Sequence, residues 1–204
     1  MSFNTTNPWK VITKQDRYDN RWVRVTHHDV LTPAGEPGIY GTVHFKHLAV
    51  GVVPVDAEGY TWLVGQYRFP LDRYSWEIPE GGGVIGVPAC TSAQRELREE
   101  TGLHAAQWLK LLECDLSNSV TDERAVLFLA WDLTQGAATP EPTEQLQIRR
   151  VPLVDAFGMI ADGTIRDAMS VLALQAVELL WKNGGLPDIG VPDGHALWRS
   201  ALRT

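Results

Sequence analysis

Cysteine is scarce in this chain: Cys90 and Cys114 are the only two among 204 residues. Two cysteines in a chain of this length cannot form the dense disulfide framework of a small secreted domain. They also make no closely spaced pair of the kind that binds zinc. This usage excludes a disulfide scaffold and a cysteine metal site, and it is typical of a protein of the reducing cytoplasm.

Long hydrophobic runs are also missing. The opening sequence, MSFNTTNPWK, lacks the apolar core of a signal peptide. No stretch approaches the roughly 18 consecutive apolar residues of a membrane-spanning helix. We therefore expect a cytoplasmic protein that does not enter a membrane.

Basic residues are in the minority, because 18 lysines and arginines stand against 25 acidic residues, a formal net charge of −7. A nucleic-acid backbone is bound by clustered lysine and arginine, so this balance argues against DNA or RNA as the main partner. It leaves room for a small phosphorylated ligand, because a single metal site can bind phosphate locally whatever the overall charge.

The chain has enough apolar sequence for a substantial core, with 44% hydrophobic and 21% charged residues. These are ordinary values for a soluble globular protein. A length of 204 residues exceeds what one small domain needs and falls short of two full domains. We expect one globular catalytic domain with an N-terminal extension.

The N-terminal part predicts a small antiparallel sheet. Residues 1–20 are polar and are expected to be irregular. Loosely alternating apolar residues at 21–31 and 39–45 predict two strands. The segment 33–38 between them is rich in Pro and Gly and predicts a turn.

The middle of the chain begins with a continuous apolar run at residues 48–55, which predicts a strand buried on both faces. Turn residues at 56–59 separate it from a second predicted strand at 60–68, so we expect the two to form a hairpin. The remaining expected elements are strands at 108–114, 125–133 and 145–151, a loop at 135–143, helices at 152–161 and 166–181, a linker at 184–194 and a tail helix at 195–202.

The clearest helix spans residues 88–101. Ala89, Ala93 and Leu97 recur at a helical interval and mark its buried stripe. Gly102 follows directly, and glycine is the residue that most often ends a helix in the left-handed conformation.

Three glutamates share one face near the end of this helix. Glu96, Glu99 and Glu100 are three and four residues apart, a spacing at which like charges repel one another. They also lie at the end of the helix where its dipole disfavours anions. Clustered carboxylates suit Mg²⁺ or Mn²⁺, which prefer oxygen ligands. The alternative is a solvated charged face whose carboxylates pair with Arg95 and Arg98.

A glycine-rich loop precedes the helix, in the sequence WEIPEGGG at residues 76–83. Glycine lets the backbone approach a ligand closely. Alone, this loop is equally consistent with a flexible turn. Followed at this distance by the acidic helix, it favours a ligand-binding loop over a flexible turn.

Together, residues 81–103 resemble the Nudix box, G-x5-E-x7-R-E-U-x-E-E-x-G-U, in which U is a bulky apolar residue. The motif is long and its spacing is strict. One position departs from it, because Val87 replaces the first glutamate. The matching residues are Gly81, Arg95, Glu96, Leu97, Glu99, Glu100, Gly102 and Leu103.

The resemblance implies an α/β fold in which a mixed β-sheet is sandwiched between helices. The wider pattern at residues 66–70, 76–79 and 121–123 is similar to the branch of ADP-ribose pyrophosphatases and GDP-mannose hydrolases. Members of that branch are typically homodimers built through N-terminal strands. The division this implies is an N-terminal β extension that mediates dimerisation at 1–47, a catalytic domain at 48–183 and a tail at 184–204.

By the same resemblance, Glu96 and Glu100 are the principal ligands of a Mg²⁺ (or Mn²⁺) cofactor, with Glu99 assisting and the backbone carbonyl of Glu80 adding a ligand. Arg95 orients the carboxylates. Gly81 and Gly102 are expected to have structural roles.

The attacking water needs a general base, and the resemblance places it in a loop beyond the box. Glu144 is the candidate and Glu141 the runner-up; either is otherwise an ordinary exposed acid. The candidate contacts to a small-molecule nucleotide substrate are Arg68 with a phosphate, Tyr67 stacked on a base or sugar, and the carboxylates of Glu77 and Glu123. The alternatives are sheet packing for Tyr67, a surface ion pair for Arg68, support of the loop for Glu77 and a turn cap for Glu123.

Two departures from the family pattern keep more than one function open. Val87 removes a carboxylate, and residues 116–120 lack the proline that many ADP-ribose-specific enzymes carry beyond the box. The favoured function is a hydrolase that cleaves the diphosphate bond of a nucleoside diphosphate joined to a sugar or similar group. The alternatives are a non-catalytic nucleotide-binding module and a fold whose box has become structural.

Overall fold

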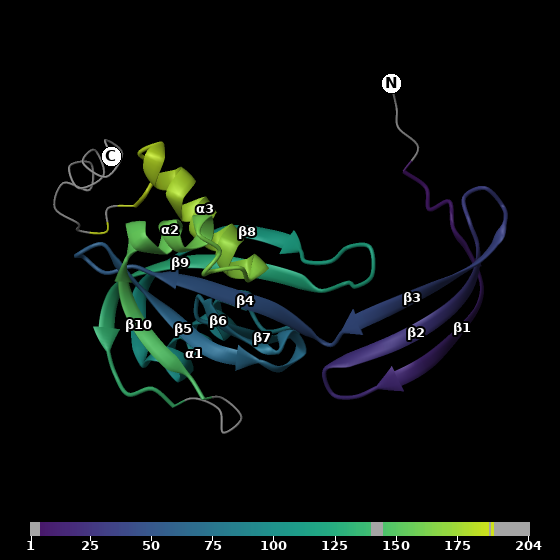
Figure 1. The fold of residues 1–204 in the computed structure, drawn as a ribbon, viewed down its shortest axis with the longest axis horizontal. Coiled ribbons are helices and arrows are strands. Elements are labelled where there is room, and N and C mark those ends of the chain that lie inside the picture. The colour runs from purple at the N-terminus through teal and green to yellow at the C-terminus, as the bar shows by residue number, and fades with distance from the viewer. Residues whose placement is uncertain (1–4, 140–144, 188, 190–204) are drawn as a thin grey trace. The chain divides into compact units, whose positions relative to one another are not determined.

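The computed structural model describes residues 5–139, 145–187 and 189, which form two compact units. Unit 1 comprises Met1–His47 and Asp115–Arg124, and unit 2 comprises Leu48–Cys114 and Ala125–Thr204. The elements (Figure 1) are β1 (Lys10–Asp19), β2 (Val23–Leu31), β3 (Pro37–Phe45), β4 (His47–Pro54), β5 (Tyr60–Arg68), the 3₁₀ turn η1 (Phe69–Leu71), β6 (Arg73–Glu77), β7 (Glu80–Val84), α1 (Ala89–Thr101), β8 (Leu103–Asp115), β9 (Arg124–Gln135), β10 (Gln147–Pro152), α2 (Leu153–Ala161) and α3 (Ala168–Lys182).

Unit 1 is built on an antiparallel sheet in the order β1-β2-β3. The predicted pair of N-terminal strands is confirmed as β2 and β3, with Thr26 opposite Thr42. The segment 115–124 belongs to the same unit, because the amide of Val43 donates to the carbonyl of Val120 at 2.9 Å. The amide of Phe45 similarly donates to the carboxylate of Asp122 at 2.8 Å.

The expectation that residues 1–20 are irregular is wrong, because residues 10–19 form β1 and pair with β2. All ten side chains of β1 are exposed. A strand that buries neither face leaves no apolar alternation in its sequence. Its backbone ladder holds it in place, together with polar contacts such as the bond from Thr26 Oγ1 to Asp16 Oδ1 at 2.7 Å.

Unit 2 contains a four-stranded sheet in the order β7-β4-β9-β8, with β4 parallel to β9. Val50, Val52 and Val53 of β4 are 0% exposed, which confirms the prediction of a strand buried on both faces. A parallel pair of this kind needs helices on both faces of its sheet. β4 thus lies inside the sheet, with β7 on one edge and β9 on the other.

Helices cover the two faces of this sheet (Figure 1). On one face, Ala93 and Leu97 of α1 pack with Val50 and Phe128 in the main core cluster. On the other, a Cβ added to Gly51 would lie 3.2 Å from the side chain of Met169 in α3, so that helix sits directly against β4. The predicted mixed sheet between helices is therefore confirmed.

A second sheet of unit 2 has the order β10-β5-β6, and it corrects the hairpin predicted for residues 48–68. β4 and β5 lie in different sheets and share a single isolated bridge between Val55 and Thr61. Both edges of β4 are already paired, with β7 and β9. Since a strand has two edges, β5 pairs with β6 and β10 instead.

The glycine-rich loop predicted at residues 76–83 is wrong for most of its length, because these residues lie in β6 and β7. The remaining predicted elements differ from the observed ones mainly in their ends. β8 begins directly after Gly102, five residues earlier than residues 108–114 suggested, since the αL glycine turns the chain straight into the strand. The predicted tail helix at 195–202 lies outside the described residues. Within the part of the chain that the structure describes, no helix has the length and apolar character to cross a membrane.

Candidate active site

Helix α1 ends in the geometry that its sequence predicts. Gly102 adopts the left-handed conformation with φ of 74°, and its amide donates to the carbonyl of Arg98 at 2.9 Å. The carbonyl of Gly102 accepts the amide of Gly136 at 2.8 Å, and the carbonyl of Glu99 accepts the amide of Thr139 at 2.9 Å. The segment 136–139 after β9 is therefore fastened to the last turn of α1.

The glutamates of the box are not a solvated face. Glu96 is 8% exposed and Glu100 is 1% exposed, while the side chain of Glu99 is 22% exposed. The amide of Glu80, at the start of β7, donates to Glu100 Oε2 at 3.0 Å. The alternative of a solvated face is thus wrong for Glu96 and Glu100, although the pairing with Arg95 that it included is observed.

Arg95 holds two of these carboxylates and the neighbouring strand. Its guanidinium donates to Glu99 Oε2 at 2.6 Å, to Glu96 Oε1 at 2.5 Å and to the carbonyl of Gly82 at 2.6 Å. Burial disfavours the charged guanidinium, but the carboxylates of Glu96 and Glu99 outweigh it and raise the pKa of Arg95. One cation therefore fixes the carboxylates and ties α1 to β7.

Gly81 is the point at which β7 meets this helix. A Cβ added there would lie 2.4 Å from the carboxyl carbon of Glu96 and 2.5–2.6 Å from its two oxygens. Only a residue without a side chain leaves the carboxylate in this place. The glutamate of the helix thus requires a glycine at this position of β7, a dependence that the sequence spacing alone does not show.

Gly81→Ala is expected to lower kcat/KM about 10–100-fold with the fold retained, because the methyl group displaces Glu96 rather than backbone. Steady-state turnover and thermal unfolding of the variant measure this. Gly83→Ala on the same strand is the control, since a Cβ there lies 3.2 Å from Ser92 Oγ. Equal activity of the two variants would contradict a special role for Gly81.

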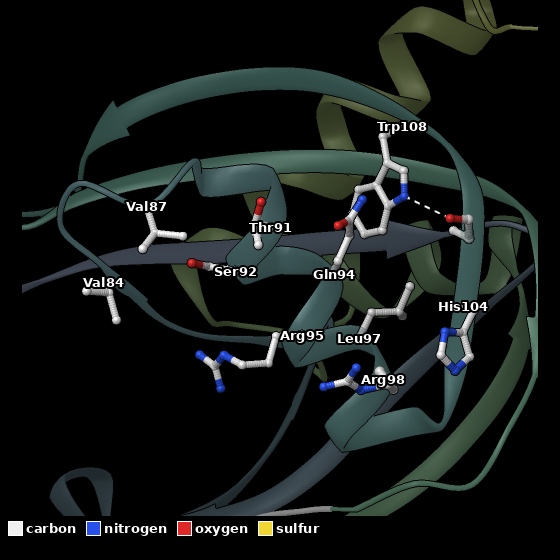
Figure 2. A pocket seen from close by; sticks show the side chains of 11 residues that line it. Val84, Val87, Thr91, Ser92, Gln94, Arg95, Leu97, Arg98, His104 and Trp108 are labelled. Carbon is white, nitrogen blue, oxygen red and sulfur yellow. Dashed lines mark hydrogen bonds between the residues drawn. The ribbon is translucent and has the colours of Figure 1, made fainter.

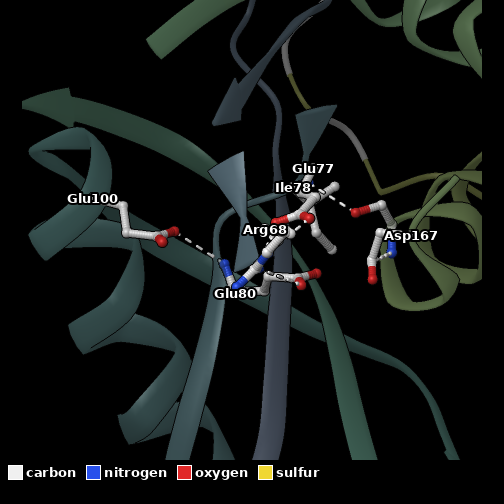
Figure 3. A network of polar contacts seen from close by, with 7 residues as sticks. Arg68, Glu77, Ile78, Glu80, Glu100 and Asp167 are labelled. Carbon is white, nitrogen blue, oxygen red and sulfur yellow. Dashed lines mark hydrogen bonds and ion pairs between the residues drawn. The ribbon is translucent and has the colours of Figure 1, made fainter. Parts of the chain in front are cut away.

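A network of polar contacts surrounds Arg68 at the end of β5 (Figure 3). Nε of Arg68 donates to both oxygens of Glu77, at 2.9 and 3.0 Å, and Nη2 donates to Glu77 Oε2 as well. Nη2 also lies 3.3 Å from Glu80 Oε1. Burial opposes the charge on Arg68, but Glu77 and then Glu80 raise its pKa above the ordinary value.

Asp167 completes this network, and sequence reasoning missed it. It is the N-cap of α3, and its Oδ2 accepts the amide of Ser170 at 2.8 Å. Burial raises the pKa of Glu80 well above its ordinary value, and repulsion from Asp167 and Glu77 adds to this. The N-cap signal of an aspartate before an apolar helix was in the sequence, but nothing local connected it to Glu77 or Glu80.

Two other predicted substrate contacts, Tyr67 and Glu123, belong to different units. Tyr67 is 57% exposed, and its hydroxyl donates to Asp72. Glu123 belongs to unit 1, where its carbonyl accepts the amide of Leu116 at 3.0 Å. Both predicted candidates for the general base, Glu144 and Glu141, lie outside the described residues.

Val87 lines a groove of about 600 Å³ beside α1 (Figure 2). Val84, Arg98, His104 and Trp108 are among the other residues of its wall. Val87 is 41% exposed. The position that carries glutamate in the box thus faces a solvent-accessible groove, so an apolar residue there leaves the buried carboxylates in place.

The residues at this site fit a divalent cation. The carboxylates of Glu96 and Glu100 are buried, and the backbone of Glu80 lies against Glu100. The absence of a side chain at Gly81 leaves the space in which the Glu96 carboxylate lies. All the donors are oxygens, the ligand type that Mg²⁺ and Mn²⁺ prefer.

Comparisons with known proteins agree with this architecture. The model of the Nudix domain matches residues 45–172, and that of the nucleoside diphosphate sugar hydrolase N-terminal domain matches residues 9–43. The ADP-ribose pyrophosphatase of Bacillus subtilis (strain 168) is 31% identical over 173 residues, 83% of this chain and 92% of that protein. That of Mycobacterium tuberculosis is 32% identical over 132 residues, 63% of this chain and 64% of that protein.

A solved structure supports the fold separately. The crystal structure of an ADP compounds hydrolase superimposes with a TM-score of 0.79 at 22% identity, covering 90% of this chain and all of that one. The family is established by the domain match and by the Bacillus subtilis relative. The chain therefore belongs to the Nudix hydrolase family, in the branch that contains the ADP-ribose pyrophosphatases.

Proposed function

We propose that this Nudix hydrolase cleaves the diphosphate bond of a nucleoside diphosphate joined to a sugar or similar group, giving a nucleoside monophosphate and a phosphorylated product. The observation that carries the proposal is the pair of buried carboxylates, Glu96 and Glu100, on one helix. Buried like charges are unfavourable. Arg95 pairs with Glu96 and Glu99, and a divalent cation would offset the negative charge that this single guanidinium does not balance. The ADP-ribose pyrophosphatase relatives support the substrate class.

We propose that Mg²⁺ or Mn²⁺ is held by Glu96 and Glu100, with Glu99 assisting and the carbonyl of Glu80 as a further ligand. A bound divalent ion would neutralise the diphosphate and lower the pKa of a bound water. Arg95 keeps the carboxylates of Glu96 and Glu99 in fixed orientations through its two short bonds. Fixing ligands in this way lowers the cost of reorganisation during the reaction.

The remaining roles concern the proton and the substrate. Glu144 is the proposed base that accepts the proton of the attacking water. Arg68 and Tyr67 are proposed to contact the substrate; in support, they are 35% (side chain) and 57% exposed. Glu77 is 1% exposed and bonded to Arg68, which favours a role in positioning that guanidinium. Glu123 stays a proposed contact.

Val87→Glu, which restores the family residue, is expected to change kcat/KM by no more than about threefold. Arg95 already bonds to Glu96, Glu99 and Gly82, and the added carboxylate would point into an exposed groove. Steady-state kinetics with saturating Mg²⁺ measures the effect. A gain of a hundredfold would show that Val87 impairs this chain.

A homodimer through the N-terminal strands is part of the proposal. β1 is an edge strand whose side chains are all exposed, including Val11 and Ile12 at 59% each. An edge strand presents unpaired backbone amides and carbonyls, on which a strand of another chain can pair. Light scattering on the purified chain tests this, and a monomer mass at all concentrations would contradict it. We also propose a cytoplasmic location, because the chain has only two cysteines, Cys90 and Cys114.

The substrate class is tested by product release from a panel of ADP-ribose, GDP-mannose, ADP-glucose, NADH and a dinucleoside polyphosphate. Each is incubated with Mg²⁺, with Mn²⁺ and with EDTA. The proposal predicts a nucleoside monophosphate in the metal-containing samples. No turnover, together with a nucleotide-induced rise in melting temperature, would instead identify a binding module, the function that Val87 favours.

A further inference from the structure

A second group of carboxylates lies at the corner where β6, β7 and α3 meet (Figure 3), next to Glu100, which accepts the backbone amide of Glu80. Glu77 ends β6, Glu80 begins β7 and Asp167 caps α3. One oxygen from each residue lies within 4.8 Å of the others. Residues distant in sequence are thus gathered around one small volume.

This cluster is buried and contains an oxygen without a donor. The side chain of Glu77 is 2% exposed and that of Glu80 is 8% exposed. Glu80 Oε2 accepts no hydrogen bond from any described residue. A buried acceptor left unpaired costs about 1–3 kcal/mol, and more when charged, so this oxygen indicates a ligand.

Among the residues that the structure describes, the acidic groups of this cluster outnumber their basic partners. Three carboxylates face one guanidinium, that of Arg68, which contacts Glu77 and Glu80. The other polar neighbour is Ser170, whose hydroxyl accepts the amide of Ile78 at 3.0 Å and whose amide is bonded to Asp167. A divalent cation would balance the two negative charges that remain when all three carboxylates are ionised.

The size of the cluster also suits a single ion. Calcium–oxygen distances are about 2.3–2.6 Å and magnesium–oxygen distances about 2.0–2.1 Å, so opposite ligands lie about 4–5 Å apart. The upper separation of 4.8 Å falls in that range. Although Glu77 is bonded to Arg68, a carboxylate has about four lone-pair sites and can accept a cation as well.

We propose that Glu77, Glu80 and Asp167 bind a divalent cation with oxygen preference, at a site separate from the carboxylates of α1. The ion ties the β6–β7 corner to the start of α3 and holds the acidic partners of Arg68 in place. It engages the carboxylate of Glu80, whereas the proposed catalytic ligand is the backbone carbonyl of the same residue. The proposal does not depend on which reaction the chain catalyses.

The test is a count of bound Mn²⁺ by electron paramagnetic resonance, in the full chain carrying Glu96→Gln and Glu100→Gln. These changes remove the two principal metal-binding carboxylates proposed for α1 without creating a cavity. The expected result is one bound Mn²⁺, displaced by excess Mg²⁺ or Ca²⁺. Adding Asp167→Asn or Glu80→Gln is expected to weaken this binding at least about tenfold, whereas Asp155→Asn, an exposed charge control on α2, is not.

The choice of asparagine at position 167 protects the fold, because its side-chain oxygen can still cap the amide of Ser170. If Asp167→Asn unfolds by circular dichroism, Glu80→Gln decides the matter. No Mn²⁺ bound in the Glu96→Gln and Glu100→Gln background overturns the proposal. Binding that survives Glu80→Gln or a folded Asp167→Asn also overturns it. Failure of the proposed hydrolysis would leave the Mn²⁺ count unchanged, so the two ideas fail separately.

Discussion

Glu100→Gln is expected to lower kcat/KM for the best substrate about a thousandfold. Loss of a group that only supports metal ligands costs about 10–100-fold, and loss of one group that stabilises transition-state charge costs about 100–1,000-fold. Glu100 is proposed to do more than either, because its carboxylate binds the metal directly. Glutamine keeps the size of the side chain but loses its charge, so we expect the substitution to lower kcat/KM rather than to disturb the fold.

The same substitution is expected to leave the fold intact. The amide oxygen of glutamine can accept the bond that the amide of Glu80 now makes to Glu100 Oε2 at 3.0 Å. A buried negative charge near Glu96 is removed, which relieves repulsion when no metal is present. Thermal unfolding with and without Mg²⁺ measures this: wild type gains stability from Mg²⁺, and the variant gains less.

Glu178→Gln is the charge-matched control for Glu100→Gln. Glu178 pairs with Lys182 on α3 at 2.7 Å, an i,i+4 ion pair that contributes less than about 1 kcal/mol. Turnover of this control should equal that of wild type. Wild-type turnover in Glu100→Gln itself would show that Glu100 does not bind a catalytic metal.

Gly102→Ala is expected to lower the free energy of unfolding by about 3 kcal/mol or more. A left-handed φ of 74° costs an L-residue about 1–2 kcal/mol. A Cβ would also lie 2.6 Å from the carbonyl oxygen of Gly136 and 2.8 Å from the amide nitrogen of Ala138. Both are backbone atoms that cannot rotate away, so overpacking adds about 1–3 kcal/mol.

Thermal unfolding measures this loss, which corresponds to a fall of about 6–12 °C in Tm for a chain of this size. Activity should fall as well, because the segment 136–139 is fastened to the end of α1. Gly158→Ala in α2 is the control, since a Cβ there meets nothing within 4 Å. Alanine inside a helix is expected to stabilise by about 0.5–1 kcal/mol. An unchanged Tm in Gly102→Ala would contradict the crowding at Gly136.

Local sequence signals predicted the active-site helix closely. The stripe of Ala93 and Leu97 is 0% exposed, and Gly102 ends α1 as expected. These features depend on interactions within a few residues, which periodicity and capping describe well. The burial of Glu96 and Glu100 could not be predicted in this way. Their spacing in the sequence predicts that the two carboxylates repel each other, but not what surrounds them.

Pairing between distant segments was harder to predict. The hairpin expected at 48–68 was wrong because β9, more than 70 residues away, takes one edge of β4. No signal in β4 or β5 contains that information. Strand β1 was missed for the opposite reason, since its exposed side chains need no apolar pattern.

The acidic cluster illustrates the same limit within a site. Glu77 and Glu80 stand close in sequence, but Asp167 reaches them only because α3 packs against β4 and Ile78. Sequence reasoning identified Arg68 and Glu77 as functional candidates and could not see that they contact each other. Tertiary packing, rather than any motif, creates this group.

The most direct test of the proposed reaction is hydrolysis of ADP-ribose in oxygen-18 water with Mg²⁺, with the products analysed by mass spectrometry. Attack of water on the diphosphate predicts AMP and ribose 5-phosphate, with one oxygen-18 atom in the phosphate of one product and none without metal. Release of ADP and unphosphorylated ribose, or no product from ADP-ribose or any other nucleoside diphosphate sugar, would contradict cleavage of the diphosphate bond by this chain.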